Sequence, residues 1–233
     1  MKKTSSLSVI VPALNEEANI REAVSGMIRS LSAGGIDWEI VLINDGSSDG
    51  TAKIIDELSS GFSQVKSLHH ESPMGLGYSI REGVQAATKD AVTWLPADGE
   101  NDPEEIFKYV SLLDQVDIVV PFVINKEVRS QGRQFLSGMF LFIINLTFWT
   151  SFKYTNGNII YKRKIFDVVS QRSTGFFFQT ECLIKAVKAG FTFTEVPIRI
   201  RQRLKGSSKA ISLKSFRAVV SEYFRLLSDI NLK

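Results

Sequence analysis

Short apolar segments, typical of strands that are buried on both faces, alternate with helical patterns over the first half of this chain. The apolar segments are residues 7–11 (LSVIV), 38–43 (WEIVLI), 65–68, 91–95 (AVTWL) and 117–120. Helical patterns lie between them at residues 19–31, 51–58, 77–87 and 103–113. Strands that alternate with helices pair in parallel, and a parallel sheet is covered by helices. The alternation therefore predicts an α/β fold with a mostly parallel central sheet flanked by helices.

The second half of the chain is less regular. It contains an apolar helical pattern at 132–150, a strand at 159–161, a helix at 179–189, a strand at 193–200 and an amphipathic helix at 213–227. The sequence shows no linker, internal repeat or low-complexity tract. Its 233 residues, 44% of them hydrophobic, suffice for one core, so we expect a single domain over residues 1–233.

Net charge differs sharply between the two halves. Residues 1–120 carry nine basic and 19 acidic side chains, a net charge of −10, whereas residues 121–233 carry 19 basic and six acidic ones, a net charge of +13. Such an asymmetry indicates that the second half meets an anionic partner. Nucleic acid, lipid head groups and phosphorylated substrates all fit this criterion.

Cysteine content and hydropathy indicate the compartment. Cys182 is the single cysteine, so an intramolecular disulfide is impossible and a reducing compartment is favoured. The apolar run at 7–11 is short and ends at Pro12, unlike a secretory signal. The longest apolar stretch, 135–152, contains polar residues and is shorter than the roughly 20 residues of a spanning helix. We expect a cytoplasmic protein without a transmembrane helix.

Three predicted strands end in polar loops, at residues 12–16 (PALNE), 44–51 (NDGSSDGT) and 96–100 (PADGE). Ligands of open parallel sheets bind beyond the carboxyl ends of the strands, so these loops are expected to converge. Asp45 directly follows a buried strand, where its carboxylate can accept hydrogen bonds from a ribose or a base. Asp49 or Ser48 is expected to cap the helix that begins near Thr51.

Charged residues in two loops suit a diphosphate. Asp98 and Glu100 can point to one side and bind Mg²⁺ or Mn²⁺, although a solvated loop that caps the helix at Pro103 is the alternative. Arg203, Lys205 and Lys209 lie in a loop with Gly206 and two serines, and such cations bind phosphate oxygens. The alternative for this loop is a solubilising run of charge.

Two further motifs have structural interpretations. Gly75 and Gly77 lack the third glycine of a dinucleotide-binding fingerprint and are expected to allow tight packing between a loop and a helix. His69 and His70 lie at the end of a predicted strand without a third ligand, so we expect no zinc site.

The segment 135–152 is apolar around most of the circumference of the predicted helix. Such a helix must be covered, either by the core, by a second copy of the chain or by a bilayer interface. Arg129, Arg133 and Lys153 lie nearby, where they can meet lipid head groups. We favour the bilayer interface and keep the other two interpretations open.

Four motifs resemble the family 2 inverting glycosyltransferases, and within them the polyprenyl-phosphate branch that includes the dolichol-phosphate mannosyltransferases. Residues 9–16 (VIVPALNE) are similar to the V-I-P-x-Y-N-E opening of the family, and residues 44–51 to its D-D-G-S-x-D-G-T. Residues 96–100 stand at the place of D-A-D-x-Q, and residues 203–209 match R-x-x-G-x-S-K. The resemblance spans about residues 7–225.

The resemblance implies a GT-A type fold and a role for each motif. Residues 1–120 would bind the donor, a UDP- or GDP-sugar, and residues 121–233 the acceptor, a polyprenyl phosphate. The nucleoside would be held by Pro12, Ala13, Leu14, Glu16, Ile43 and Asp45. Asp98 and Glu100 would hold Mg²⁺ or Mn²⁺, and Arg203 and Lys209 the diphosphate, so that Asp98, Arg203 and Lys209 act in catalysis. Arg133 and Ser137, one helical turn apart, would hold the lipid phosphate.

The motifs depart from the family pattern at three places. Asn44 and Pro96 stand where the family has carboxylates, and residues 121–123 (PFV) stand where the branch often has G-S-R. The metal requirement is therefore an expectation taken from the family rather than from a complete acidic motif. Arg129 is a candidate for the missing acceptor arginine.

The resemblance implies sugar transfer at the cytoplasmic face of a membrane. We expect peripheral membrane contact and no nucleic-acid partner, and a homo-oligomer remains an open alternative. A lipid phosphate is already anionic and needs no general base, whereas a sugar hydroxyl would need one. Glu181 is the candidate base for a hydroxyl acceptor, and its alternative is a charge at a helix N-terminus. A nucleotidyltransferase would show a glycine-rich basic loop after the first strand, which residues 12–16 lack. A non-catalytic membrane-binding module would not explain the converging acids.

Overall fold

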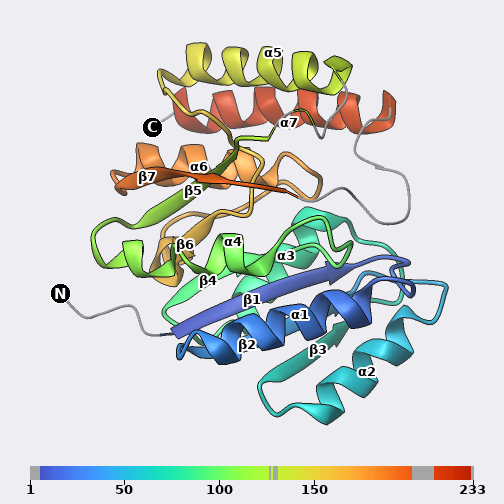
Figure 1. The fold of residues 1–233 in the computed structure, drawn as a ribbon. Helices are drawn as coiled ribbons and strands as arrows, with labels where there is room; N and C mark the ends of the chain where they lie inside the picture. The colour runs from blue at the N-terminus through green and yellow to red at the C-terminus, as the bar shows by residue number, and fades with distance from the viewer. Residues whose placement is uncertain (1–5, 126, 128–130, 201–212, 232–233) are drawn as a thin grey trace.

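The computed structural model describes residues 6–125, 127, 131–200 and 213–231 (Figure 1). Its strands are β1 (Ser6–Ala13), β2 (Asp37–Asn44), β3 (Val65–His69), β4 (Ala91–Trp94), β5 (Ile118–Val123), β6 (Ile160–Lys162) and β7 (Phe193–Ile198). Its α-helices are α1 (Ile20–Ala33), α2 (Thr51–Gly61), α3 (Leu76–Ala86), α4 (Pro103–Phe107), α5 (Gln131–Phe148), α6 (Phe178–Lys188) and α7 (Leu213–Asn231). Two 3₁₀ turns complete the described elements, η1 (Val110–Asp114) and η3 (Arg163–Asp167).

All seven strands form one sheet in the order β3-β2-β1-β4-β6-β5-β7. The pairs β1–β2, β1–β4, β2–β3 and β5–β7 are parallel, and β6 is antiparallel to both β4 and β5. The predicted α/β fold with a mostly parallel sheet is thus confirmed. Because β6 lies between β4 and β5, the donor and acceptor halves expected from the sequence share this sheet.

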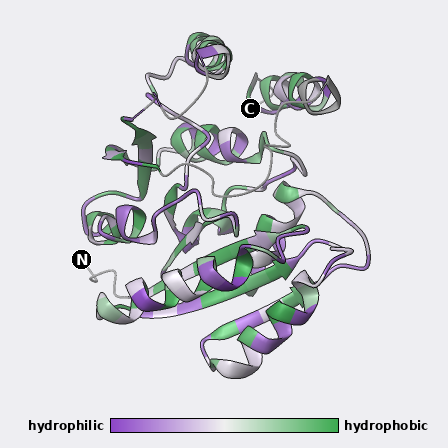
Figure 2. Cartoon of the chain, turned by 45° about the vertical axis from the view of Figure 1, so that its right-hand side comes forward, coloured by the Kyte–Doolittle hydropathy of each residue, from purple (hydrophilic) through white to green (hydrophobic). Residues whose placement is uncertain are grey.

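Helices cover both faces of the sheet and enclose two hydrophobic clusters. Leu7, Val9 and Val11 of β1 contact the cluster that holds the buried faces of α1, α2 and α4. Ile10 points the opposite way, into the cluster that holds α3, α5, α6 and α7. This alternation follows from the two-residue period of a strand. Figure 2, coloured by hydropathy, shows the central strands as hydrophobic.

Helices α5 and α7 form the outermost layer on the α6 side (Figure 1). Thr147 Oγ1 and Tyr223 OH are hydrogen-bonded at 2.7 Å, and the ring of Phe148 meets that of Tyr223 edge-on. Ile144 and Phe148 are buried in the second cluster. Within the described ranges, no helix combines the length and apolarity needed to cross a bilayer.

The predicted helix at 103–113 is wrong in its extent. Helix α4 ends at Phe107, and the chain continues through a turn into η1. Tyr109 donates a hydrogen bond from its hydroxyl to the Pro197 carbonyl at 2.7 Å, which fixes this turn against β7. The tighter turn still directs Ile106, Val110 and Leu113 into the first cluster. The apolar residues of this segment are therefore buried as the sequence predicts, although the backbone is not one continuous helix.

Candidate functional site

The carboxyl ends of β1, β2 and β4 lie side by side at one edge of the sheet, toward which β1 points in Figure 1. Pro12 is paired with Ile43 and Ala13 with Asn44 in the β1–β2 register. The Asp45 amide donates to the Ala13 carbonyl at 2.9 Å, so Asp45 extends this pairing beyond the strands. The structure therefore brings together Pro12, Ala13, Ile43 and Asp45, as the sequence predicts.

The loops after β1 and β2 are joined by hydrogen bonds. Asn15, with a left-handed φ of 57°, donates from its amide to Ser47 Oγ at 3.0 Å and accepts from the Ser48 amide at 2.8 Å. The Glu16 amide donates to Thr51 Oγ1 at 2.9 Å, and its carboxylate accepts from Asn19 Nδ2. Leu14 and Glu16, both predicted donor residues, are thus held partly exposed in a fixed loop.

Asp49 lies one residue before the N-cap position of α2, where the sequence predicts a capping residue and the structure has Gly50. Its carboxylate accepts hydrogen bonds from the amide and the hydroxyl of Thr51, the first residue of α2. It therefore lies at the start of the helix, although Gly50 is the residue that formally precedes α2. Asp49 and Asp45 thus differ in role: Asp49 accepts hydrogen bonds within its own loop, whereas Asp45 lies at the end of β2.

Asp45 is buried and accepts three hydrogen bonds. Its Oδ1 accepts from the Met74 amide at 2.7 Å and lies 2.8 Å from His70 Nδ1, and its Oδ2 accepts from the Gly75 amide at 3.0 Å. The loop after β3 is therefore wrapped around the carboxylate. An ionised carboxylate has about four lone-pair sites, so Oδ2 keeps capacity for a ligand donor.

His70 is the residue of this site that the sequence argument missed. Its Nδ1 meets Asp45 and its Nε2 lies 2.5 Å from Glu82 Oε2 on α3. Burial favours the neutral ring, but the hydrogen bonds and charges of Asp45 and Glu82 outweigh burial and raise the pKa of His70 above its ordinary value of 6.5. Its position at the end of β3, beside β2, is the one sequence signal that could have indicated it.

Gly75 and Gly77 fix the loop after β3 against residues 173–175. A Cβ at Gly77 would lie 2.5 Å from the Ser173 carbonyl oxygen and 2.9 Å from that of Gly175. The Gly77 amide donates to the Thr174 carbonyl at 2.8 Å. Gly75 has a left-handed φ of 100°, which favours glycine. The predicted packing role of these glycines is confirmed.

Asp98 lies in the loop after β4, on the other side of β1 from Asp45. Its side chain is buried and accepts a hydrogen bond from the Glu100 amide at 3.1 Å, across Gly99 with its left-handed φ of 71°. Asn101 forms a bridge with Ile200, so the Asp98 loop lies beside the end of the described segment that follows β7. Arg203 and Lys209 lie outside the described residues.

The acidic loop after β4 contains the two residues that the sequence predicts as metal ligands. In the described part of the chain, no three acidic, histidine or cysteine side chains gather closely enough to bind a metal on their own. Asp98 and Glu100 offer two carboxylates, and Pro96 offers none. Mg²⁺ often binds through one or two carboxylates, with phosphate and water oxygens completing the shell. The two residues therefore fit a metal that is shared with a diphosphate.

The other predicted residues lie elsewhere. Arg133 and Ser137 belong to α5, and Figure 1 shows this helix beginning on the side toward which β1 points. Glu181, in the first turn of α6, is buried and accepts from the amides of Arg172 and Ser173 and from Lys185 Nζ. These donors bind both of its oxygens, which supports the helix N-terminal interpretation and disfavours a role as general base.

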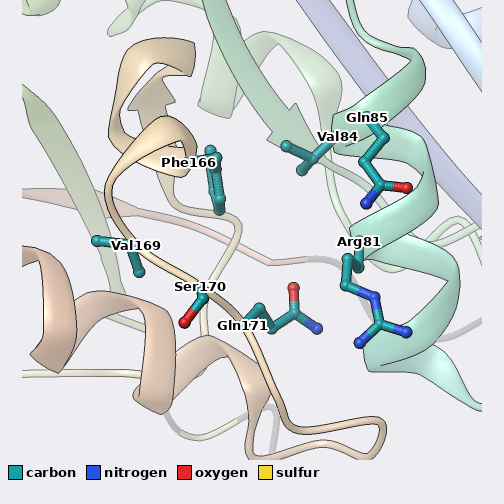
Figure 3. Close-up of a pocket in the computed structure, with 7 residues that line it drawn as sticks. All are labelled: Arg81, Val84, Gln85, Phe166, Val169, Ser170 and Gln171. Carbon is teal, nitrogen blue, oxygen red and sulfur yellow. The ribbon is translucent and has the colours of Figure 1, made fainter.

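The structure also contains a hollow of about 250 Å³, whose lining residues are drawn in Figure 3. It is lined by residues 81, 84 and 85 of α3 and by residues 166 and 169–171. None of the predicted site residues borders it. The chemistry at the strand ends, rather than this hollow, identifies the candidate site.

Comparison with known proteins finds related sequences. The family model for glycosyl transferase family 2 matches residues 8–170. The chain is 28% identical to a polyprenol monophosphomannose synthase of Mycolicibacterium smegmatis, covering 90% of this chain and 82% of that protein. It is 30% identical to an undecaprenyl-phosphate 4-deoxy-4-formamido-L-arabinose transferase of Salmonella paratyphi B, covering 87% of this chain and 62% of that relative's length.

Solved structures share the fold. Glucosyl-3-phosphoglycerate synthase from Mycobacterium tuberculosis, crystallised with Mg²⁺ and UDP, superposes with a TM-score of 0.73 at 20% identity, covering 96% of this chain and 80% of that one. The complex of the same enzyme with Mn²⁺, UDP and glucosyl-3-phosphoglycerate has a TM-score of 0.70 at 20% identity, covering 97% and 80%. At this identity the likeness concerns the fold.

Proposed function

The chain belongs to glycosyl transferase family 2, and we propose that it transfers a sugar, with inversion, from a nucleotide-sugar to a polyprenyl phosphate at a membrane surface. It is therefore a glycosyltransferase. Two relatives whose names state polyprenol or undecaprenyl phosphate chemistry support the acceptor class. The observation that carries the proposal is the meeting of the β1, β2 and β4 ends, with Asp45 and Asp98 buried on either side of β1.

We assign donor binding to residues 1–120. Pro12, Ala13 and Ile43 would form the wall of the nucleoside site, with Leu14 and Glu16 at its rim, and Asp45 would accept a hydrogen bond from the ribose or the base. Asp98 and Glu100 would hold Mg²⁺ or Mn²⁺, which would neutralise charge on the departing nucleoside diphosphate. Arg203 and Lys209 would donate to the same phosphates, and this stabilisation grows as the sugar leaves.

We assign acceptor binding to residues 121–233. A phosphate oxygen of the lipid is already charged near pH 7, so attack on the sugar carbon needs no general base. The engagement of Glu181 by three donors fits such a reaction better than a hydroxyl acceptor. Arg133 and Ser137, on the helix that begins on the side toward which β1 points, would hold the lipid phosphate.

Helix α5 would contact the lipid surface. Exposed apolar side chains recur along it at three- and four-residue intervals, at Phe135, Met139, Phe142 and Leu146, and the exposed Trp149 directly follows its last residue. This spacing gives one continuous outward stripe, opposite Ile144 and Phe148 in the core. Trp149 is 90% exposed, and tryptophan favours the boundary between lipid and water. The net charge of +13 over residues 121–233 favours an anionic surface such as that of lipid head groups.

Transfer to vesicle-bound acceptor tests the proposal. Purified protein is incubated with labelled UDP- and GDP-sugars and with vesicles that contain either undecaprenyl phosphate or undecaprenol, with Mn²⁺ or with EDTA. We expect labelled lipid only with the phosphate, with inverted anomeric configuration by NMR. Transfer to soluble sugar hydroxyls but not to the lipid phosphate would refute the acceptor, and equal transfer with EDTA would refute the metal.

A further inference from the structure

His70 has a carboxylate at each of its two ring nitrogens. Nδ1 lies 2.8 Å from Asp45 Oδ1, and Nε2 lies 2.5 Å from Glu82 Oε2. The His70 and Asp45 side chains are 9% and 7% exposed, and that of Glu82 is 33% exposed, so one side of this triad is closed to water. None of the roles inferred above uses Glu82.

The geometry constrains the protonation state of His70. A neutral imidazole has one N–H donor, whereas an ionised carboxylate can only accept. Both contacts are therefore hydrogen bonds at once when the ring is an imidazolium between two carboxylates. A neutral ring would leave one nitrogen lone pair against a carboxylate oxygen, and that contact would be repulsive.

The groups facing the His70 ring come from the loop after β2 and from α3. Asp45 follows β2, while Glu82 and Tyr78 belong to α3. The Tyr78 ring meets the His70 ring edge-on, with 5.4 Å between the ring centroids. The Arg81 guanidinium lies over the Tyr78 ring, 4.9 Å from its centroid. His69 points elsewhere and pairs with Asp56 at 3.1 Å. The two carboxylates thus dominate the surroundings of His70, in agreement with its raised pKa.

We propose that His70 is a positioning residue which, as the imidazolium, holds the Asp45 carboxylate in the orientation that receives the donor nucleoside, so that donor binding weakens when His70 loses its proton. This inference rests on the proposed role of Asp45 in donor binding. The imidazolium occupies Asp45 Oδ1 together with the Met74 amide, leaving the free capacity on Oδ2. Its charge also offsets one carboxylate beside a site for an anionic diphosphate.

Glu82 contributes to the proton affinity of His70 from the ring nitrogen that faces away from Asp45. A glutamine at this position removes one of the two negative charges that favour the imidazolium, while the Asp45 carboxylate stays in place. Glu82→Gln should therefore lower the pH at which His70 titrates. A purely structural histidine would show no matching movement in ligand affinity.

The experiment combines NMR titration of the histidine ring protons with calorimetric binding of UDP and GDP, each with Mn²⁺, from about pH 6 to about pH 9. The variants are His70→Gln, Glu82→Gln and the control His69→Gln, which changes the adjacent histidine. The His70→Gln protein also shows how far the phosphates of the nucleotide contribute to any pH dependence. Thermal unfolding of each variant establishes that it is folded.

We expect wild-type affinity to fall about threefold to tenfold as pH rises through the His70 midpoint, the size of one hydrogen bond. His70→Gln should lack this change, His69→Gln should retain it, and Glu82→Gln should move the NMR and binding midpoints to lower pH together. The inference would be overturned, and the proposed function left standing, if the binding midpoint of Glu82→Gln did not move or if nucleotide affinity of His70→Gln depended on pH as in the wild type. Absence of binding of either nucleotide at every pH would overturn the proposed function as well.

Discussion

Lys66 Nζ lies 2.7 Å from Glu39 Oε2, and this ion pair joins the neighbouring strands β2 and β3. Ser8 Oγ donates to the same carboxylate from β1, at 2.6 Å, and Thr88 donates from the segment before β4. Burial opposes the charge of Glu39, but these donors outweigh burial and lower the pKa of Glu39 to about 2. One carboxylate therefore stabilises the end of the sheet opposite the candidate site.

Replacing this carboxylate should destabilise the fold in a pH-dependent way. Glu39→Gln leaves donors of Ser8, Lys66 and Thr88 poorly matched, so the free energy of unfolding at pH 7 should fall by about 2–3 kcal/mol. Because the folded pKa is lowered, the stabilisation is complete above the ordinary value of 4.5 and is lost as pH falls toward 2. Urea unfolding of both proteins should thus show a difference that shrinks below about pH 4.

The control for Glu39 is the exposed Glu57, which pairs with Arg21. Glu57→Gln makes the same chemical change at the surface and should alter the free energy of unfolding by less than about 1 kcal/mol. Equal effects of the two substitutions would contradict the role given to Glu39.

Adding a methyl group at Gly77 should strain the contact between α3 and residues 173–175. The new Cβ would meet backbone carbonyl oxygens at 2.5 and 2.9 Å, and backbone yields less readily than a side chain. Gly77→Ala should therefore lower the free energy of unfolding by about 1–3 kcal/mol. Gly138→Ala is the matched change, since a Cβ there has open space, and it should leave stability equal or raise it by roughly 0.5–1 kcal/mol. A tolerated Gly77→Ala would refute the close approach.

Replacing Trp149 should weaken binding to membranes without lowering the stability of the fold. Trp149 has a left-handed φ of 52°, which asparagine tolerates better, so Trp149→Asn should leave thermal unfolding unchanged or slightly higher. Loss of the exposed indole should weaken binding to anionic vesicles severalfold in a sedimentation assay. Phe62→Asn removes another exposed aromatic ring, beyond α2, and should bind vesicles like the wild type. Similar losses in both variants would argue against α5 as the contact.

Two acids of one loop should differ in catalysis. Asp98→Asn removes a proposed metal ligand and should reduce sugar transfer at least a hundredfold, with a weaker response to added Mn²⁺. Asp102 lies before α4 and accepts a hydrogen bond from the Glu104 amide at 3.2 Å, a role that asparagine also fills. Asp102→Asn should therefore keep most of the activity. The prediction fails if both variants transfer sugar equally well.

The positions of the strand ends could be predicted from the sequence because short local runs of apolar residues determine them. Apolar runs such as Trp38–Ile43 and the rule that parallel strands bind ligands at their carboxyl ends suffice to place Asp45 beside Ala13. The incomplete glycine motif at Gly75 and Gly77 likewise indicated a packing role, which the close approach of residues 173–175 confirms. Arg203 and Lys209, which the motifs assign to the diphosphate, lie outside the described residues and stay predictions.

Other parts of the site depend on contacts between distant residues. The hydrogen bonds from Asp45 through His70 to Glu82 join the residue after β2, the residue after β3 and helix α3. Neither hydrophobic periodicity nor motif spacing predicts these contacts. Glu181 looked like a candidate base because its charge was visible in the sequence, whereas the amides that engage it were not. Helix α4 ends at Phe107, and the Tyr109 hydroxyl just beyond it donates to the Pro197 carbonyl of β7, a long-range contact that helix periodicity cannot anticipate.

The antiparallel strand β6 also limits how this enzyme could be divided or recombined. It enters the sheet from beyond α5 in the chain and fills the gap between β4 and β5. A fragment that stops before α5 would leave the edge of β4 unpaired and open to association with other chains. Exchange of acceptor specificity between relatives should therefore succeed by grafting loops and outer helices onto an intact sheet, and fail by joining halves.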